Sequence, residues 1–212
     1  MNLFGIFDPV FHALNNAKII RNIISWVMKI QASIIALVGF YGCYSIIRLG
    51  ITARRSVLDL EGNYVTHVPV DIVIGGVLLA LFVLAWGCLT AIILAYRSQT
   101  VMESGDNRFI ALSIISLIFR VCGELAFVTY SLFGIGGCLF SWITSENPYV
   151  QISFLGDILP FPVRGGPGFM GGLEFAIFSL MFAFSFIVFF YALAEYIAVQ
   201  VEIAANTRGL RK

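Results

Sequence analysis

The sequence predicts an all-α integral membrane protein, a bundle of four transmembrane helices with an N-terminal amphipathic helix. Hydrophobic residues make up 59% of the 212-residue chain and charged residues 12%, against ~45–50% and ~25% in soluble domains. The apolar residues also gather in four long blocks. A helix needs roughly 20 such residues to cross the hydrocarbon core of a bilayer. This composition excludes an ordinary soluble domain.

Residues 1–29 are expected to form the amphipathic helix, on the cytoplasmic side. Apolar residues recur there at helical spacing, opposite a polar face: Val10, Leu14, Ala17, Ile20, Ile24 and Val27. This helix either packs on the bundle or lies on the inner leaflet, with Lys18, Arg21 and Lys29 near anionic head groups. The two placements are compatible.

The four spans are expected at about 30–47, 72–95, 109–133 and 175–194. The third block stays apolar to about Ile143, and some 35 residues would reach about 50 Å as one straight helix. That length is too great for a bilayer unless the helix tilts strongly. Gly134, Gly136 and Gly137 therefore predict a break after Phe133, followed by a bend or a separate short segment over Cys138–Thr144.

Two outer loops, 48–71 and 145–173, connect these spans. The first contains Glu61-Gly62-Asn63 between two short apolar runs, a pattern that predicts a β-hairpin. The second combines four prolines with many apolar residues, so we expect it to lie on the outer membrane surface or against a partner. Its run Arg164–Gly168 either presents backbone amides to an anion or forms a flexible entry into the fourth span.

The distribution of lysine and arginine sets the orientation. Eight of these residues lie on the side that holds both chain ends: Lys18, Arg21, Lys29, Arg97, Arg108, Arg208, Arg211 and Lys212. Four lie on the other side: Arg48, Arg54, Arg55 and Arg164. Because cytoplasmic loops are the more basic, we expect a protein of the cell inner membrane with both termini in the cytoplasm. An organellar membrane is the alternative.

Arg120 and Glu124 are the main candidate site residues, because both lie near the middle of the third span. Each charge at that depth costs about 2.5–3.5 kcal/mol on the insertion scale. Their spacing of four puts them on one helix face, where they can pair, and the pair must face protein or water rather than lipid. Two interpretations stay open. In the structural one, the pair is a polar clasp that fixes helix register, or a contact to another subunit. In the functional one, the pair lines a path for an ion, proton or anionic ligand.

The fourth span provides a candidate interface made of Glu195, Glu202, Phe182 and Phe186. Phenylalanines surround much of this span, and such bulky rings suit lipid or a broad partner surface better than a pore. Glu195 lies where the apolar run ends. Together with Glu202 it also fits the solvated face of an amphipathic extension.

Cofactor, metal and nucleic-acid sites are not predicted. The only two histidines, His12 and His67, lie outside the spans, so two histidines cannot hold a haem between helices. The four cysteines, in apolar segments, lack the spacing of a zinc site. No phosphate-binding loop or nucleophile motif is present. With 13 basic and 12 acidic residues, the charge balance gives no support to nucleic-acid binding.

The two ends of the chain carry a family resemblance. The basic amphipathic lead-in, the first span and a last span that ends in Glu195, Glu202, Ile203, Asn206 and Arg208 are similar to an uncharacterised family of small bacterial multi-span membrane proteins. The match covers about a third of the chain. The resemblance implies a bacterial membrane location and no particular activity.

These observations favour a non-catalytic membrane subunit that assembles with other membrane subunits or with copies of itself, in contact with the lipid bilayer. A small oligomeric transporter or channel, with Arg120 and Glu124 lining the path, is the alternative. A membrane-bound enzyme acting on a lipid or quinone is the third hypothesis. It would need a deep pocket between the loop 145–173 and the third span.

Overall fold

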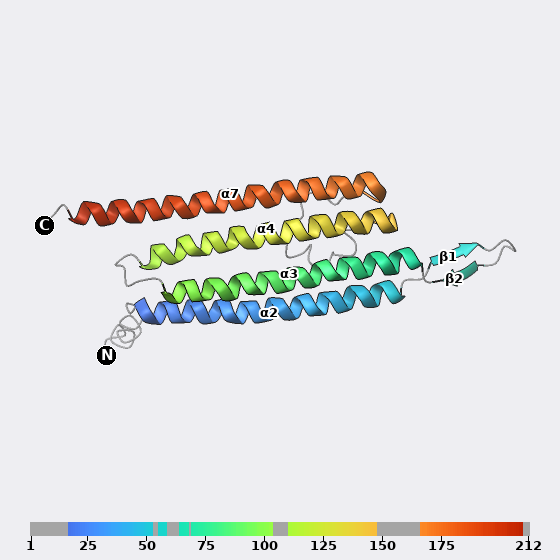
Figure 1. Ribbon diagram of the computed structural model, residues 1–212, viewed down its shortest axis with the longest axis horizontal. Helices are drawn as coiled ribbons and strands as arrows, with labels where there is room; N and C mark the ends of the chain where they lie inside the picture. The colour runs from blue at the N-terminus through green and yellow to red at the C-terminus, as the bar shows by residue number, and fades with distance from the viewer. Residues whose placement is uncertain are drawn as a thin grey trace, which may run out of the picture. The chain divides into compact units, whose positions relative to one another are not determined.

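The computed structural model describes residues 17–52, 55–58, 64–67, 69–103, 110–147 and 166–209. This part of the chain forms four long helices and one pair of strands (Figure 1). The elements are α2 (Ala17–Thr52), β1 (Arg55–Leu58), β2 (Tyr64–His67), α3 (Val70–Glu103), α4 (Ile110–Thr144) and α7 (Gly168–Gly209). All four helices are long and apolar enough to cross a membrane. The predicted class, a helical protein with four candidate spans, is confirmed at this level.

Every helix is longer than the span predicted for it. The helices contain 36, 34, 35 and 42 residues, about 50–63 Å at 1.5 Å per residue, whereas the hydrocarbon core is about 30 Å thick. Hydropathy marks the part of a helix that suits lipid, and it does not mark the helix ends. Residues 168–173, predicted as the end of an outer loop, are accordingly the first turns of α7.

The predicted boundary between the amphipathic helix and the first span is wrong. Residues 17–29 are the beginning of α2, which continues to Thr52 without a break. No glycine or proline lies in residues 17–38 to interrupt it. Residues 1–16, which carry the rest of the predicted amphipathic helix, lie outside the described residues.

The predicted break in the third span is also wrong, because α4 runs continuously from Ile110 to Thr144. Its glycines serve close packing instead. A Cβ atom at Gly134 would lie 2.6 Å from the Cβ of Ser179 on α7, and one at Gly136 would lie 2.8 Å from the Phe82 ring on α3. Small residues at such points let helix backbones approach each other in a membrane.

The predicted hairpin is confirmed. β1 and β2 pair antiparallel, with Arg55 opposite His67 and Leu58 opposite Tyr64. The connecting residues 59–63 and most of the second outer loop, residues 148–165, lie outside the described residues. The loop's predicted surface location and its Arg164–Gly168 run therefore stay predictions.

The chain divides into two compact units, and each helix contributes one segment to each. Unit 1 takes its described residues from 17–34, 91–124 and 187–209, and unit 2 from 35–90 and 125–186. Unit 2 contains the apolar core, formed by Ile46, Leu79, Ala80, Val83, Trp86, Phe133, Phe140 and Phe175. One polar contact lies at its edge, where the Trp86 indole N–H donates to the hydroxyl of Thr129 at 2.9 Å.

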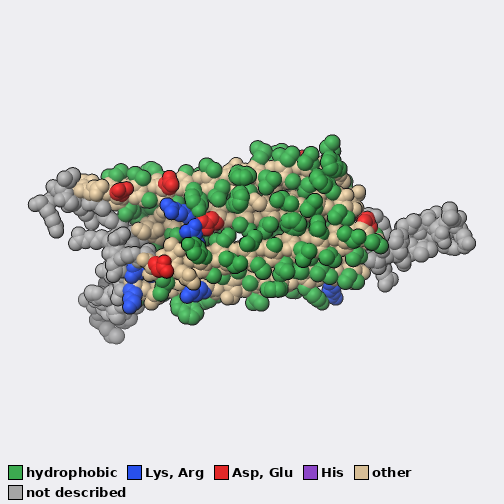
Figure 2. All heavy atoms as spheres, in the orientation of Figure 1, with side chains coloured by type: hydrophobic (Ala, Val, Ile, Leu, Met, Phe, Trp, Pro, Cys, Tyr) green, Lys and Arg blue, Asp and Glu red, His purple; other side chains and the backbone are tan. Residues whose placement is uncertain are grey.

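Unit 1 exposes several large apolar side chains and buries several polar ones. Ile23 and Trp26 of α2 are 52% and 66% exposed, whereas Arg21 and Ser25 on the same helix are buried. Ser98 of α3 and Ser116 of α4 are buried as well. Figure 2 shows hydrophobic side chains over most of the face that it draws. An apolar exterior with polar groups inside suits a lipid surrounding, as expected of a multi-pass membrane protein.

Candidate functional site

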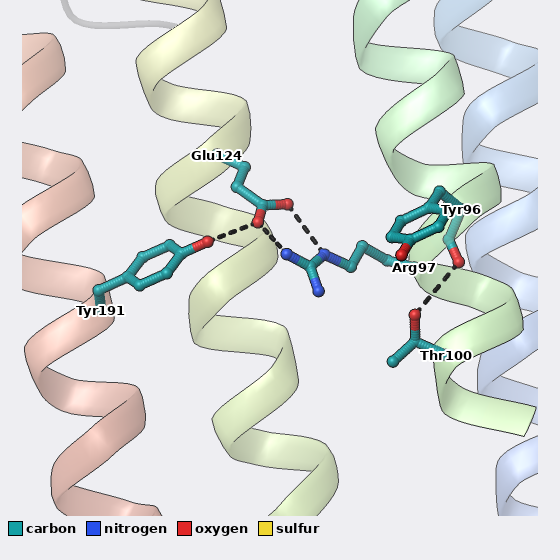
Figure 3. Close-up of polar contacts among 5 residues, drawn as sticks. All are labelled: Tyr96, Arg97, Thr100, Glu124 and Tyr191. Atoms are coloured by element: carbon teal, nitrogen blue, oxygen red, sulfur yellow. Dashed lines mark hydrogen bonds and ion pairs between the residues drawn. The ribbon is translucent and has the colours of Figure 1, made fainter. Parts of the chain in front are cut away.

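The most developed polar site is a three-helix network in unit 1, centred on Glu124 of α4 (Figure 3). Arg97 of α3 donates from Nε to Oε2 of Glu124 at 3.0 Å and from Nη2 to Oε1, so the pair is bidentate. Tyr191 of α7 donates its hydroxyl proton to Oε1 at 2.6 Å. One carboxylate thus joins three helices.

Local packing brings α7 within reach of Glu124. The preceding residue is Gly123, where a Cβ atom would lie only 3.1 Å from the Cβ of Phe190. Because Gly123 has no side chain, α7 approaches α4 closely at this level, and Tyr191 follows Phe190 directly in the sequence. The rings of Phe119 and Phe190 stack beside the network, with centroids 6.1 Å apart. The close approach and the stacked rings hold the Tyr191 hydroxyl against the carboxylate.

The network neutralises two charges that would otherwise be costly in the bundle. The side chains of Arg97 and Glu124 are 20% and 17% exposed. An ion pair in a partly buried place offsets its desolvation only when geometry is good and further hydrogen bonds satisfy the remaining atoms. The bidentate geometry and the Tyr191 hydroxyl meet both conditions. The arrangement is suited to holding helices together.

The structure differs from the predicted Arg120–Glu124 pair. The ion-pair partner of Glu124 is Arg97, and its two oxygens already accept three hydrogen bonds from α3 and α7. The guanidinium of Arg120 lies instead over the Tyr191 ring, with Cζ 6.0 Å from the ring centroid. Hydropathy had ended the second span before Arg97, which therefore counted as a loop residue. The extension of α3 to Glu103 brings it into the bundle.

A pocket of about 310 Å³ adjoins Arg120 in unit 1. It is lined by Thr100 of α3, by Ser113, Ile114, Ser116, Leu117 and Arg120 of α4, and by Ala198 and Val201 of α7. The Ser116 hydroxyl donates to the backbone carbonyl of Ala194 at 2.8 Å. The buried Nε atom of Arg120 has no hydrogen-bond partner among the residues that the structure describes. Sequence reasoning identified Arg120 but not this pocket, whose walls come from three helices.

The four candidate interface residues divide between the units. Phe182 and Phe186 belong to unit 2, where both rings pack on Tyr130, with centroids 6.2 and 5.5 Å from the Tyr130 ring centroid. Glu195 and Glu202 belong to unit 1, and both are exposed. Neither carboxylate has a partner among the described residues, whereas Phe186 is half-buried inside its unit.

Glu195 and Glu202 lie on a regular exposed stripe of α7. The stripe consists of Val188, Ala192, Glu195, Val199 and Glu202, all of them exposed. Their spacings of four and three residues place them on one face of the helix. The same alternation marks the a and d positions of a coiled-coil seam. We call this surface the α7 stripe.

Among the described residues, no group of three histidine, cysteine, aspartate or glutamate side chains could hold a metal ion. The four cysteines are free thiols, from buried Cys138 to exposed Cys88. Comparison of the chain with protein-family models, with curated protein sequences and with solved structures gave no significant match.

Proposed function

We propose that this chain is a non-catalytic membrane subunit that assembles with another membrane protein through the α7 stripe. The observation that carries the proposal is the pair of exposed carboxylates, Glu195 and Glu202, set in an otherwise apolar helix face. Both lie within Gly168–Ile203, the part of α7 that is a candidate membrane span. Their apolar neighbours Val199 and Ile203 are 51% and 53% exposed.

An unpartnered carboxylate on a lipid-facing helix is unfavourable. The cost is about 2.5–3.5 kcal/mol at the bilayer centre and falls toward the interface. A partner helix that presents lysine or arginine to the stripe removes this cost and gives the contact its specificity. A second copy of the chain would instead place the same carboxylates opposite each other in a symmetric contact, which is repulsive. The expected partner is therefore a different chain with a basic helix.

We further place the subunit in a bacterial inner membrane, with both termini in the cytoplasm. The excess of lysine and arginine on the side of the termini supports this orientation, and the family resemblance of the chain ends supports the bacterial location. Unit 1, which contains the α7 stripe, holds the described residues nearest to both termini. The basic partner residues would then lie near the cytoplasmic surface.

The test is purification of the full chain in a mild detergent, with particle mass and co-purifying proteins measured. We compare the wild type with a Glu195→Gln/Glu202→Gln variant and with Glu103→Gln, which changes an exposed carboxylate on α3. The double variant should lose a stoichiometric partner that the wild type and Glu103→Gln retain. A photo-crosslinker at Val199 should capture the same partner, and one at exposed Tyr96 of α3 should not.

The proposal would be contradicted if the wild type purified alone or as a homo-oligomer. It would also be contradicted if the partner remained bound after both carboxylates were removed. Because neither carboxylate has a partner among the described residues, the double variant should keep the helical content and melting temperature of the wild type, which separates loss of binding from loss of folding.

A small transporter or channel is the second candidate, and the polar interior of unit 1 is the observation that favours it. Arg21, Ser25, Ser98 and Ser116 are buried there, and Arg120 borders the pocket. In this case Arg120→Leu would reduce solute flux in proteoliposomes. Unchanged flux together with weakened assembly would exclude this function for Arg120.

A further inference from the structure

We infer that the pocket of unit 1 binds a phosphate group, with Arg120 as its anchoring cation. The chemistry is that of a phosphate-bearing lipid head group or a free phosphate compound. The inference is independent of the assembly function proposed above. It is supported by the hydrogen-bond and ion-pair contacts of Arg120, by the residues that line the pocket and by the position of the pocket along the helices.

Among the described residues, Arg120 has no counter-ion. Its Nε atom is buried with no hydrogen-bond partner in this part of the chain, and the nearest carboxylate on its own helix face, Glu124, is paired with Arg97. The guanidinium also lies over the Tyr191 ring, with its Cζ atom 6.0 Å from the ring centroid. A buried or lipid-facing cation is costly until an anion accepts its N–H groups.

The polar side of the pocket suits a phosphate more than a cation. A guanidinium binds phosphate oxygens through two parallel N–H bonds. Among the described residues no carboxylate lines the pocket; the other polar residues carry the hydroxyl groups of Thr100, Ser113 and Ser116. The hydroxyl protons of Thr100 and Ser116 are directed to the backbone carbonyls of Tyr96 and Ala194. Arg120 is therefore the principal donor for an anion.

The remaining walls are apolar, and they favour a lipid as the source of the phosphate. Ile114 and Leu117 of α4 face the pocket together with Ala198 and Val201 of α7. A free phosphate would leave these surfaces without a contact, whereas the glycerol and first methylene groups of a lipid would cover them. A volume of about 310 Å³ lies at the lower end of the range for small-molecule sites.

The position of the pocket fits a lipid head group. Thr100 lies three residues before the end of α3, and Ser113 lies three residues after the start of α4. Ten residues separate the start of α4 from Arg120, about 15 Å along the helix axis. The pocket therefore extends inward from helix ends, where head groups and the first part of the acyl chains are found. A phosphate in the pocket would lie between these helix ends and Arg120, whose long side chain can extend toward it.

The experiment measures ligand binding to the full chain by native mass spectrometry and by melting temperature in alkyl maltoside micelles, a detergent without phosphate. The micelles are used alone or with added phosphatidylglycerol, and a parallel series adds inorganic phosphate. The variants are Arg120→Gln, Arg120→Lys and Arg48→Gln, the last removing an exposed arginine of α2. Phosphatidylglycerol should bind the wild type and raise its melting temperature.

Arg120→Gln should weaken that binding by about ten- to hundredfold, as expected for loss of hydrogen bonds from a charged group. Arg120→Lys should retain part of it, and Arg48→Gln all of it. In the phosphate-free detergent alone, Arg120→Gln should melt no lower than the wild type, because no ligand is present and the variant removes a cation that has no ion-pair partner among the described residues. This second measurement separates loss of the ligand from loss of the fold.

The remaining outcomes distinguish the sources. Protection by inorganic phosphate that depends on Arg120, without protection by phosphatidylglycerol, assigns the pocket to a soluble phosphate compound. Equal binding of phosphatidylglycerol by the wild type and Arg120→Gln would overturn the inference. So would the absence of Arg120-dependent binding by both probes.

Discussion

Glu124 of α4 and Arg97 of α3 form a bidentate ion pair, and the Tyr191 hydroxyl of α7 donates to the same carboxylate. Lipid tails are as apolar as helix surfaces, so the hydrophobic effect does not drive helices together inside a membrane. Close packing and interhelical polar contacts hold them together instead. A single acidic group that gathers donors from two neighbouring helices fixes the relative register of three segments of unit 1. Arg120, one turn earlier on α4, is left for other contacts.

Glu124→Gln should destabilise the protein by about 3 kcal/mol, because it leaves the Arg97 guanidinium without a counter-ion in a partly buried place. Unfolding of the purified protein in mixed micelles measures the change. Arg48→Gln, at an exposed arginine of α2, is the control and should change the free energy of unfolding by less than about 0.5 kcal/mol. Equal free energies of unfolding for the two variants would show that the Arg97–Glu124 ion pair does not contribute to stability.

Tyr191→Phe should cost about 1–2 kcal/mol, since it deletes one charge-assisted hydrogen bond and keeps the ring. The matched control is Tyr196→Phe on the same helix, where the tyrosine is 64% exposed. The same unfolding assay reports both. If Glu124→Gln and Tyr191→Phe act through one network, the double variant should lose less than the sum of the single losses.

The four candidate membrane spans and the presence of a hairpin could be predicted from the sequence because both depend on local patterns. Apolar blocks of sufficient length identify spans, and a glycine–asparagine turn between apolar runs identifies a hairpin. The ends of the helices could not be predicted, since the apolar runs end near Ala95 and Ala194 whereas α3 and α7 continue to Glu103 and Gly209.

The partners of the charged residues could not be predicted, since they come from other helices. The spacing of Arg120 and Glu124 is compatible with a pair, but Arg97 and Tyr191 reach the carboxylate through tertiary packing. Gly134 and Gly136 illustrate the same limit. A glycine that breaks a helix and a glycine that admits a neighbouring side chain look alike in a single sequence, and only the positions of Ser179 and Phe82 show which one applies.

Thr129→Val should destabilise unit 2 by about 1 kcal/mol, since the buried Trp86 N–H would lose its acceptor. Thr90→Val makes the same substitution at a second buried threonine and serves as the comparison. Thr90 is buried in the same unit, and its hydroxyl has no hydrogen-bond partner in the described part of the chain, so its removal should be neutral or stabilising. Melting temperatures of the two variants in one detergent test this, and the opposite order would contradict it.

Gly87→Ala should destabilise the protein by about 1–3 kcal/mol through overpacking, because Gly39 of α2 and Gly87 of α3 meet backbone to backbone. A Cβ atom at either glycine would lie 2.8 Å from the Cα of the other. The obstructing atoms are backbone, so the two segments must separate, and no side-chain rotation relieves the contact.

Gly50→Ala is the control for this last prediction. The nearest atom to its added Cβ would be the carbonyl oxygen of Ile72 at 3.7 Å, an ordinary contact. Both variants gain alanine's helix propensity, about 1 kcal/mol over glycine in a helix interior, so the difference between them reports the close approach. Unfolding in mixed micelles should place Gly87→Ala below the wild type and Gly50→Ala at or above it. Equal stability of the two alanine variants would mean that α2 and α3 do not depend on close approach at this pair of glycines.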